Sequence, residues 1–374
     1  MPGLYIHIPF CEKKCMYCDF FSTETFRQYD SFLSALHTEI YLRARLLADT
    51  PAFDSVFFGG GTPSLLGDVQ LGGILEALHG RFDITQDAEI TVECNPGTVD
   101  VDSLRGYRDA GVNRLSFGVQ SFHSDDLLFL GRTHTVEEAE AGILMAQDAG
   151  IPNVNLDLMF SLPGQTPERW HYNLERARAL GTTHLSCYSL TVEKDTPLER
   201  MVACGMVIMP PEESDAALFE LTMQTLDAWG YCRYEVSNYA LPGYECRHNL
   251  TYWRHGEYIG FGPSAYSTFH NRRWWNVRDV ERYVEALVAG TLPEAGEEEL
   301  TPETQRGEYI FLRLRSEGID LAEFRRRFST DLLADNRAFI DHCISDGLLY
   351  SDGNVLRLTP GGVLVCDEIC VELR

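Results

Sequence analysis

Short runs of apolar residues alternate with amphipathic segments through the first 240 residues of the chain. Several runs are nearly continuous in apolar residues, as in parallel strands covered on both faces. Strands are therefore predicted at Leu4–Pro9, Ser55–Phe58, Glu89–Glu93, Arg114–Val119, Val154–Phe160, His184–Leu190 and Arg233–Ser237. Helices are predicted between them at Ser31–Leu47, Leu65–Leu78, Asp102–Ala110, Val136–Ala149, Pro167–Leu180 and Glu212–Trp229. Most strand starts lie about 25 to 40 residues apart, the length of a βα unit, which predicts an α/β barrel, complete or partial.

The pattern changes after this barrel core, predicted as residues 1–240. Residues 241–290 are rich in aromatic residues and glycine, and we interpret them as an extension of the barrel with a short helix at Arg282–Val288. Residues 291–302 are acidic, contain a proline and are predicted to be a linker. Residues 303–374 carry a helical pattern followed by a hairpin signal, which is typical of a winged-helix domain; the alternative is a generic helical cap. The segments behind this prediction are Glu303–Arg315, Leu321–Phe328, Asp331–Asp346, and Leu348–Tyr350 with Val355–Leu358 around Asp352-Gly353.

Charge and composition exclude several classes of protein. The 374 residues contain 56 acidic and 31 basic side chains, a formal net charge of −25. Such a surface repels nucleic-acid phosphates and anionic lipid, so we expect no nucleic-acid binding, even from the winged-helix-like part. No apolar run is long enough to span a bilayer, and the amino-terminal residues lack a signal-peptide layout, which predicts a cytoplasmic protein. Eleven cysteines in that reducing compartment are not expected to form a disulfide framework.

Three cysteines stand close together directly after the first predicted strand. Cys11, Cys15 and Cys18 lie in CEKKCMYC, with three and then two residues between them. Three thiolates from one loop can hold three irons of a [4Fe–4S] cluster and leave the fourth iron open to a ligand that is not protein. A structural zinc site would need a fourth cysteine or a histidine. The carboxyl end of a barrel strand is where barrel active sites are built, so the spacing predicts a functional cluster.

This cysteine loop resembles the signature of the radical S-adenosylmethionine (SAM) superfamily. In that family the open iron is chelated by SAM, and one electron from the cluster breaks the sulfonium bond to give a 5′-deoxyadenosyl radical. The resemblance implies that Tyr17 contacts the adenine. Glycines at Gly59–Pro63, after the second strand, would let the backbone approach the amino group of SAM. Glu93, at the end of the third strand, would bind the ribose hydroxyls.

Further segments resemble the group that contains oxygen-independent coproporphyrinogen III oxidase. The matching segments are Tyr5–Cys11, Gly59–Ser64, Glu93–Thr98, Arg114–Phe122, Gly131-Arg132, Asn155–Met159, Leu162–Thr166 and Gly260–Ala265. By position, the resemblance implies that the cluster-bound SAM is lined by Tyr5, Gly60, Glu93 and Tyr266. It implies a second SAM pocket, whose groups could instead hold another anionic or polar ligand, at Gly61, Thr62, Gln120, Arg132, Asp157 and Thr191.

Two departures from the oxidase pattern point to its sister family, the HemW heme chaperones. Phe20 stands where the oxidase has a further cysteine, and the oxidase's long arm before the cluster motif is missing. A third feature agrees, because His248–Trp253 reads HNLTYW and matches the HemW heme motif H-N-x-x-Y-W. The resemblance implies that His248 ligates the heme iron.

The motif has its own chemical logic. Imidazole is a common axial ligand of heme iron, and Tyr252 and Trp253 offer apolar faces to a porphyrin. Arg247 and Arg254 could pair with the propionates. The alternative for His248 is a packed, hydrogen-bonded core histidine; His255 and Cys246 are weaker alternative ligands.

The sequence therefore predicts a heme chaperone that binds a [4Fe–4S] cluster, SAM and heme, and delivers heme to target hemoproteins. The expected partners are a heme donor, acceptor hemoproteins and an electron donor; a dimer or peripheral membrane association is left open. No catalytic residue is assigned. The alternative is the oxidase itself, which decarboxylates coproporphyrinogen III by radical chemistry.

Overall fold

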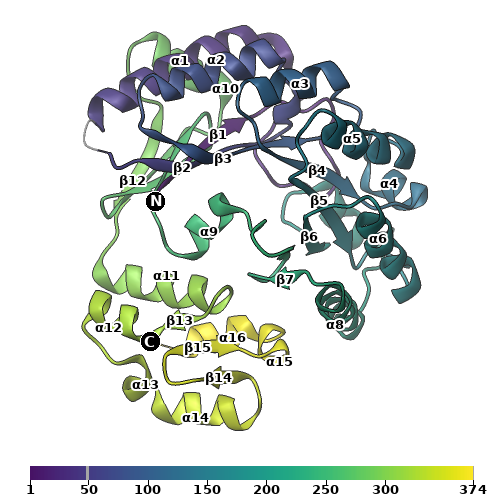
Figure 1. Cartoon of the computed structure of the whole chain (residues 1–374), viewed down its shortest axis with the longest axis vertical. Helices are drawn as coiled ribbons and strands as arrows, with labels where there is room; N and C mark the ends of the chain where they lie inside the picture. The colour runs from purple at the N-terminus through teal and green to yellow at the C-terminus, as the bar shows by residue number, and fades with distance from the viewer. Residues whose placement is uncertain (48–49, 374) are drawn as a thin grey trace.

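The computed structural model describes residues 1–47 and 50–373. A twelve-stranded sheet forms its centre, and six neighbouring parallel strands curve through the middle of that sheet (Figure 1). These strands are β1 (Gly3–Ile8), β2 (Phe53–Gly60), β3 (Ile84–Cys94), β4 (Arg114–Gln120), β5 (Val154–Phe160) and β6 (His184–Ser189). Helices cover their outer face: α1 (Tyr29–Leu46), α2 (Asp68–His79), α3 (Val101–Asp109), α5 (Val136–Asp148), α6 (Pro167–Ala179) and α8 (Glu212–Ala228). The predicted partial α/β barrel is confirmed.

The two faces of the parallel strands differ in chemistry. Residues such as Ile90, Val92 and Leu156 join one apolar core. The alternate positions of the same strands face the interior, and many of them are polar and line a cavity: Glu93, Ser116, Asn155, Asp157 and Ser186. The apolar side chains of these strands therefore pack under the helices, and polar side chains face the interior of the barrel.

Both margins of the sheet differ from the sequence prediction. The strand predicted at Arg233–Ser237 is wrong: β7 is only Cys232–Arg233 and β8 is Asn238–Ala240, antiparallel to β6. At the other margin β9 runs parallel to β1 and begins an antiparallel meander: β9 (Tyr258–Phe261), β10 (Tyr266–Phe269), β11 (Arg272–Asn276) and β12 (Glu294–Glu299). Half of the acidic segment predicted as the linker 291–302 is strand β12, held to β11 by ion pairs of Arg272 with Glu297 and of Arg273 with Glu298.

The carboxyl-terminal part has a separate small core, built around Tyr309, Phe324 and Leu356. Its predicted helices and hairpin are present, except that Asp331–Asp346 is divided into two helices. The elements are α11 (Pro302–Leu314), β13 (Ile319–Asp320), α12 (Leu321–Phe328), α13 (Leu332–Asp335), α14 (Arg337–Ser345), β14 (Leu349–Ser351), β15 (Val355–Leu358), α15 (Pro360–Val363) and α16 (Cys366–Glu372).

Short helices complete the chain: η1 (Phe26–Gln28), η2 (Pro63–Leu65), α4 (Ser124–Leu130), α7 (Pro197–Ala203), α9 (Arg247–Trp253) and α10 (Val280–Val288). Of these, α9 carries the HNLTYW motif and lies between the barrel sheet and α11 (Figure 1). No helix in the described part of the chain is both long and apolar enough to cross a bilayer.

Candidate functional site

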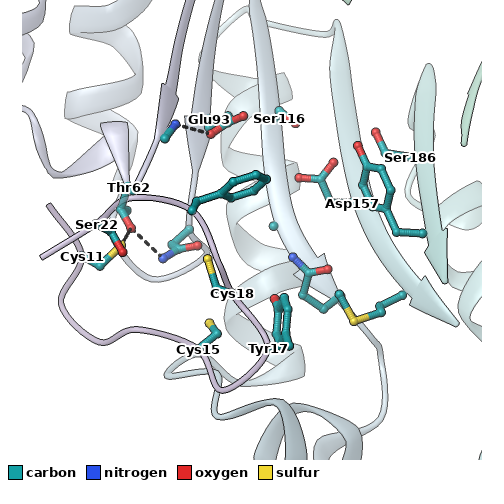
Figure 2. A pocket seen from close by; sticks show the side chains of 18 of the residues that line it. Cys11, Cys15, Tyr17, Cys18, Ser22, Thr62, Glu93, Ser116, Asp157 and Ser186 are labelled. Atoms are coloured by element: carbon teal, nitrogen blue, oxygen red, sulfur yellow. Dashed lines mark hydrogen bonds between the residues drawn. The ribbon is translucent and has the colours of Figure 1, made fainter. Parts of the chain in front are cut away.

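The three cysteines lie on the loop that follows β1, beside the carboxyl ends of the strands (Figure 2). The loop begins where the Cys11 amide donates to the Thr23 carbonyl at 3.0 Å and the Thr23 amide donates to the Pro9 carbonyl at 2.7 Å. All three thiols are half-buried and line one cavity of ≈ 400 Å³. The sequence prediction that these cysteines belong to one site is therefore consistent with their placement.

The donor set fits a [4Fe–4S] cluster. Among the described residues, no group of three or more His, Cys, Asp or Glu side chains could hold a single metal ion. A cluster needs no such convergence, because each thiolate binds a different iron. Burial raises the pKa of the Cys18 thiol to about 11, so a bound iron would be what holds its thiolate at neutral pH. Two groups already face the sulfurs: Thr62 donates to Cys11 at 3.5 Å and Arg132 to Cys15 at 3.4 Å.

The glycine turn after β2 forms the next wall of this cavity. Gly60 has φ +111°, and a Cβ there would lie 2.5 Å from the His7 ring. A Cβ on Gly61 would lie 2.6 Å from the Phe10 carbonyl oxygen. The Gly61 amide donates to Ile8 and the Thr62 amide to Phe10, so the turn is fastened to the start of the cysteine loop. Packing against the His7 ring at Gly60 and against backbone at Gly61 therefore already requires these glycines.

Two carboxyl groups face each other inside the barrel. Glu93 accepts a hydrogen bond from the Gly60 amide at 3.2 Å, and Asp157 accepts one from Asn155 at 2.8 Å. Burial, and then the negative charge of Asp157, raise the pKa of Glu93 to about 8. Burial also raises the pKa of Asp157. Such a pair suits a ligand that carries positive charge and hydroxyl groups, which the sulfonium and ribose of SAM would supply.

The residues predicted to bind SAM or a second ligand are brought together. The cavity of the three cysteines is also lined by Tyr17, Gly60, Gly61, Thr62, Glu93, Gln120, Arg132, Asp157 and Thr191. Tyr5 and Tyr266 line a neighbouring cavity of ≈ 360 Å³, which shares Gly60 and Glu93 with the first. The exposed side chain of Phe20 stands at the border of both cavities. Figure 2 shows the cysteine loop opposite Glu93 and Asp157.

Sequence reasoning missed several residues deeper in the barrel. Arg114, at the start of β4, is buried, lines the cluster cavity, and has no hydrogen-bond partner for its Nε within the described residues. Asn249 of the HNLTYW motif lines the same cavity. A charged residue that opens an apolar strand was the available signal for Arg114. No local signal could place Asn249, because α9 comes from far along the chain.

His248 does not sit as an iron ligand in this structure. Its side chain is buried, with 1% exposure. Nδ1 hydrogen-bonds with the Ser55 hydroxyl at 2.9 Å and Nε2 with the Tyr252 hydroxyl at 2.7 Å, so both ring nitrogens are occupied. The ring stacks on Tyr5 and Phe57, and burial lowers its pKa to about 3. This is the packed, hydrogen-bonded core histidine that the sequence left open as the alternative.

The neighbours predicted for the heme motif are engaged as well. Arg247 donates to the Asp87 carbonyl at 2.9 Å. Arg254 makes a two-point ion pair with Glu317 at 2.7 and 2.8 Å through Nε and Nη2. Trp253 is half-buried at the end of α9. Tyr252 lines a cavity of ≈ 840 Å³, and so does His255, the weaker alternative ligand.

Comparison with known proteins decides the family. Residues 5–177 match the radical SAM superfamily and residues 300–365 match the HemN C-terminal domain. The chain is 35% identical to the heme chaperone HemW of Bacillus subtilis (strain 168) over 374 residues, which cover 99% of this chain and 98% of that protein. The chain belongs to the HemW family. Another HemW, from Mycobacterium tuberculosis (strain H37Rv), is 38% identical and covers 98% of this chain and 93% of its own.

HemW proteins and the oxidase share one architecture. The HemW of Escherichia coli (strain K12) is 41% identical over 271 residues, 71% of this chain and 69% of its own. Among solved structures, coproporphyrinogen III oxidase (HemN) from Escherichia coli, described as a radical SAM enzyme, has a TM-score of 0.85 at 25% identity, covering 100% of this chain and 90% of that one. The radical SAM domain of a HemW protein implies a [4Fe–4S] cluster and SAM.

Proposed function

We propose that this protein is a heme chaperone, which binds heme and passes it to target hemoproteins. The observation that carries the proposal is coverage: proteins named heme chaperone HemW align with 98–99% of the chain, including its carboxyl-terminal part. Phe20 supports it, because this exposed side chain stands at the cavity border where the oxidase pattern has a further cysteine. The proposal includes a heme donor and an electron donor as partners, and it requires no nucleic acid.

The cofactor residues follow from the cavity. Cys11, Cys15 and Cys18 would hold the [4Fe–4S] cluster and leave one iron to SAM. When bound, the cluster would supply one-electron reduction of the SAM sulfonium. Around it, Arg132 and Thr62 donate to the thiolates, and the hydroxyl-binding Glu93 faces the ligand. The first SAM site is assigned to Tyr5, Tyr17, Gly60, Glu93 and Tyr266, and a second pocket, for SAM or another polar ligand, to Gly61, Thr62, Gln120, Arg132, Asp157 and Thr191.

Hemin titration of the reconstituted protein tests this function. We expect a saturable Soret band with wild type, followed by transfer of the bound heme to an apo-hemoprotein in excess. His248→Ala is titrated in parallel, because the HNLTYW motif names His248 as the ligand. If wild-type protein gives no Soret change, the chaperone proposal fails.

The oxidase is the second candidate, and the fold is compatible with it, because HemN aligns with the whole chain at a TM-score of 0.85. An anaerobic assay with reductant, SAM and coproporphyrinogen III separates the two. Formation of protoporphyrinogen would replace the chaperone proposal with the oxidase. SAM cleavage without tetrapyrrole conversion would instead indicate that the cluster serves another reaction.

A further inference from the structure

The cluster cavity, the ≈ 400 Å³ cavity of the three cysteines, extends along the inside of β4. Alternate side chains of a strand face the same side, and four such residues of β4 line the cavity: Arg114, Ser116, Gly118 and Gln120. Gln120 ends the strand on the side of the cysteine loop, so Arg114 stands at the opposite end. We call that end, formed by Arg114 with Ser116, Asn155 and Ser186, the barrel floor.

Arg114 carries a positive charge that no described residue binds directly. It is 1% exposed, and its Nε is buried without a hydrogen-bond partner. Across the described part of the chain, no hydrogen bond or ion pair joins its guanidinium to another residue. Burial works against the charge, but Cys246 and Glu89 outweigh it, so the pKa of Arg114 is raised. A guanidinium that stays charged while its five N–H groups lack acceptors is costly to bury, which points to an acceptor that is not protein.

The nearest strong acceptor is committed to another element. Glu89 Oε1 accepts hydrogen bonds from the His248 amide at 3.2 Å and from the Cys246 thiol at 3.4 Å. These two residues begin α9, so the carboxylate stabilises the positive end of that helix. Glu89 therefore balances the charge of Arg114 from a distance and forms no ion pair with it.

The other polar groups of the barrel floor bond to one another. Asn155 Oδ1 lies 2.6 Å from His184 Nδ1 and accepts from the Ser186 hydroxyl at 3.1 Å. Its Nδ2 donates to Asp157 at 2.8 Å. Figure 2 shows Asp157 and Ser186 on neighbouring strands of this wall. This network is complete without Arg114, so a structural role in the network does not account for the arginine.

A small carboxylate fits the unused donors. A guanidinium binds a carboxylate through two parallel N–H···O bonds, the geometry in which both groups are satisfied. The hydroxyl of Ser116 accepts from Asn155 at 2.7 Å, which leaves its proton for a ligand oxygen. A single negative charge suits the floor better than a phosphate dianion, because Glu89 and Asp157 are close to Arg114. The ligand is also small, since cavities for ligands range from about 300 to 1,000 Å³ and this one lies at the low end.

We propose that the barrel floor binds a small monocarboxylate, with its carboxylate on the guanidinium of Arg114. The ligand is distinct from the cluster-bound SAM, whose carboxylate is assigned to the open iron at the other end of the cavity. The site does not depend on heme binding, so hemin titration and the tests below can fail separately.

Acetate is the probe for the affinity test, and acetamide, which has nearly the same shape without the charge, is its control. Saturation-transfer nuclear magnetic resonance on the reconstituted, SAM-loaded protein measures binding. We expect Arg114→Gln to weaken acetate binding by about tenfold or more, and acetamide to bind neither protein. Arg105→Gln, on the exposed side of α3, is the matched control and should stay within about twofold of wild type. Circular dichroism and iron content verify that the variants fold and carry the cluster.

Two outcomes of that test would overturn the site. One is equal acetate affinity in wild type and folded Arg114→Gln, which would mean that acetate binds only adventitiously at other arginines. The other is loss of SAM binding in Arg114→Gln with acetate binding unchanged, which would assign Arg114 to SAM.

The wild-type protein offers a second test that needs no folded Arg114→Gln. The Nε–H resonance of Arg114 is assigned by its absence from the spectrum of ¹⁵N-labelled Arg114→Lys, which keeps the charge. We expect this resonance to shift saturably with acetate and to stay in place with acetamide, because acetate supplies the missing acceptor. If no buried arginine Nε–H resonance of wild type moves with acetate, the proposal is wrong, and Arg114 serves only as the distant counter-charge of Glu89.

Discussion

The guanidinium of Arg132 lies 3.4 Å from the sulfur of Cys15, and its other amino group donates to Asn95 Oδ1 and to the Gly118 carbonyl, each at 2.6 Å. Three elements distant in sequence therefore hold one cation beside the cysteine loop. A fixed positive charge at this distance stabilises a thiolate and any negative charge that a bound cluster gains on reduction.

Replacing Arg132 should therefore loosen the cluster. We expect Arg132→Met to lower the midpoint potential of the reconstituted cluster and to speed its loss to chelator, at a cost of about 2 kcal/mol in folding free energy from the broken hydrogen bonds. Arg105→Met, at an exposed position of α3, is the control. Potentiometry and iron content measure the effect, and equal potentials in the two variants would contradict it.

Replacement by alanine should change the unfolding free energy in opposite directions at Gly60, in the glycine turn, and at Gly73, in α2. Gly60→Ala places a methyl group against His7 in a left-handed backbone, so we expect a loss of about 3 kcal/mol in unfolding free energy together with weaker SAM binding. Gly73→Ala, in the middle of α2 and free of neighbours, should instead gain about 0.5–1 kcal/mol. Urea titrations give both values, and the same sign for the two variants would refute this account.

The raised pKa of Glu93 makes the folding stability depend on pH. The folded protein retains a proton on this carboxyl up to about pH 8, whereas the unfolded chain releases it near its ordinary pKa of 4.5. This contribution to stability is full below pH 4.5 and is lost as pH rises through about 8. We expect Glu93→Gln to flatten this fall, measured by urea unfolding without SAM. Glu76→Gln, on exposed surface, should leave it as in wild type.

The buried His248 predicts the opposite pH dependence, with stability falling as the pH becomes acidic. Its pKa is lowered from 6.5 to about 3, so the unfolded chain takes up a proton that the folded protein refuses. Stability from the neutral ring is present above pH 6.5 and is lost as pH falls toward 3, a loss on the order of a few kcal/mol. His248→Gln should reduce this acid sensitivity, whereas His79→Gln, at the exposed end of α2, should retain it. Identical acid curves for all three proteins would mean that His248 is not the buried base.

Cluster and heme should bind independently in equilibrium titrations. Cys15→Ser removes one thiolate from the cluster cavity, but Cys15 does not line the ≈ 840 Å³ cavity beside Tyr252 of the HNLTYW motif. We expect iron–sulfur absorbance to disappear while hemin affinity stays within about twofold of wild type. Cys204→Ser, an exposed cysteine, serves as control. Loss of hemin binding with the cluster would show that the two sites are one.

The sequence predicted the barrel because its signals are local. Each of β1 to β6 contains closely spaced apolar residues, and α12 and β15 were predicted at their observed bounds. β12 escaped prediction because its stability is not local: its glutamates are compensated by Arg272 and Arg273 on β11, about 25 residues earlier. From composition alone, such a strand is predicted to be a linker.

The candidate site likewise has residues that the sequence could predict and residues that it could not. The cysteine loop, the glycine turn and Glu93 could be predicted from the spacing of motifs in the sequence. In the structure they line one cavity. The burial of His248 could not be read from HNLTYW, because it depends on Ser55 and Phe57 of β2. The ≈ 840 Å³ cavity beside Tyr252 could not be predicted either, since its walls come from α9, the β9–β12 meander and α11.

The two margins of the sheet bear on how the protein behaves at high concentration. An open sheet exposes unpaired amide and carbonyl groups along its outermost strands, which can recruit strands of another molecule. Here one outermost strand, β7, has only two residues, too few to template a partner. The other, β12, carries Glu294, Glu297 and Glu298 in ion pairs with arginines, and a docking strand would have to strip water from these charged groups. The acidity of that segment thus protects a long sheet against edge-to-edge aggregation.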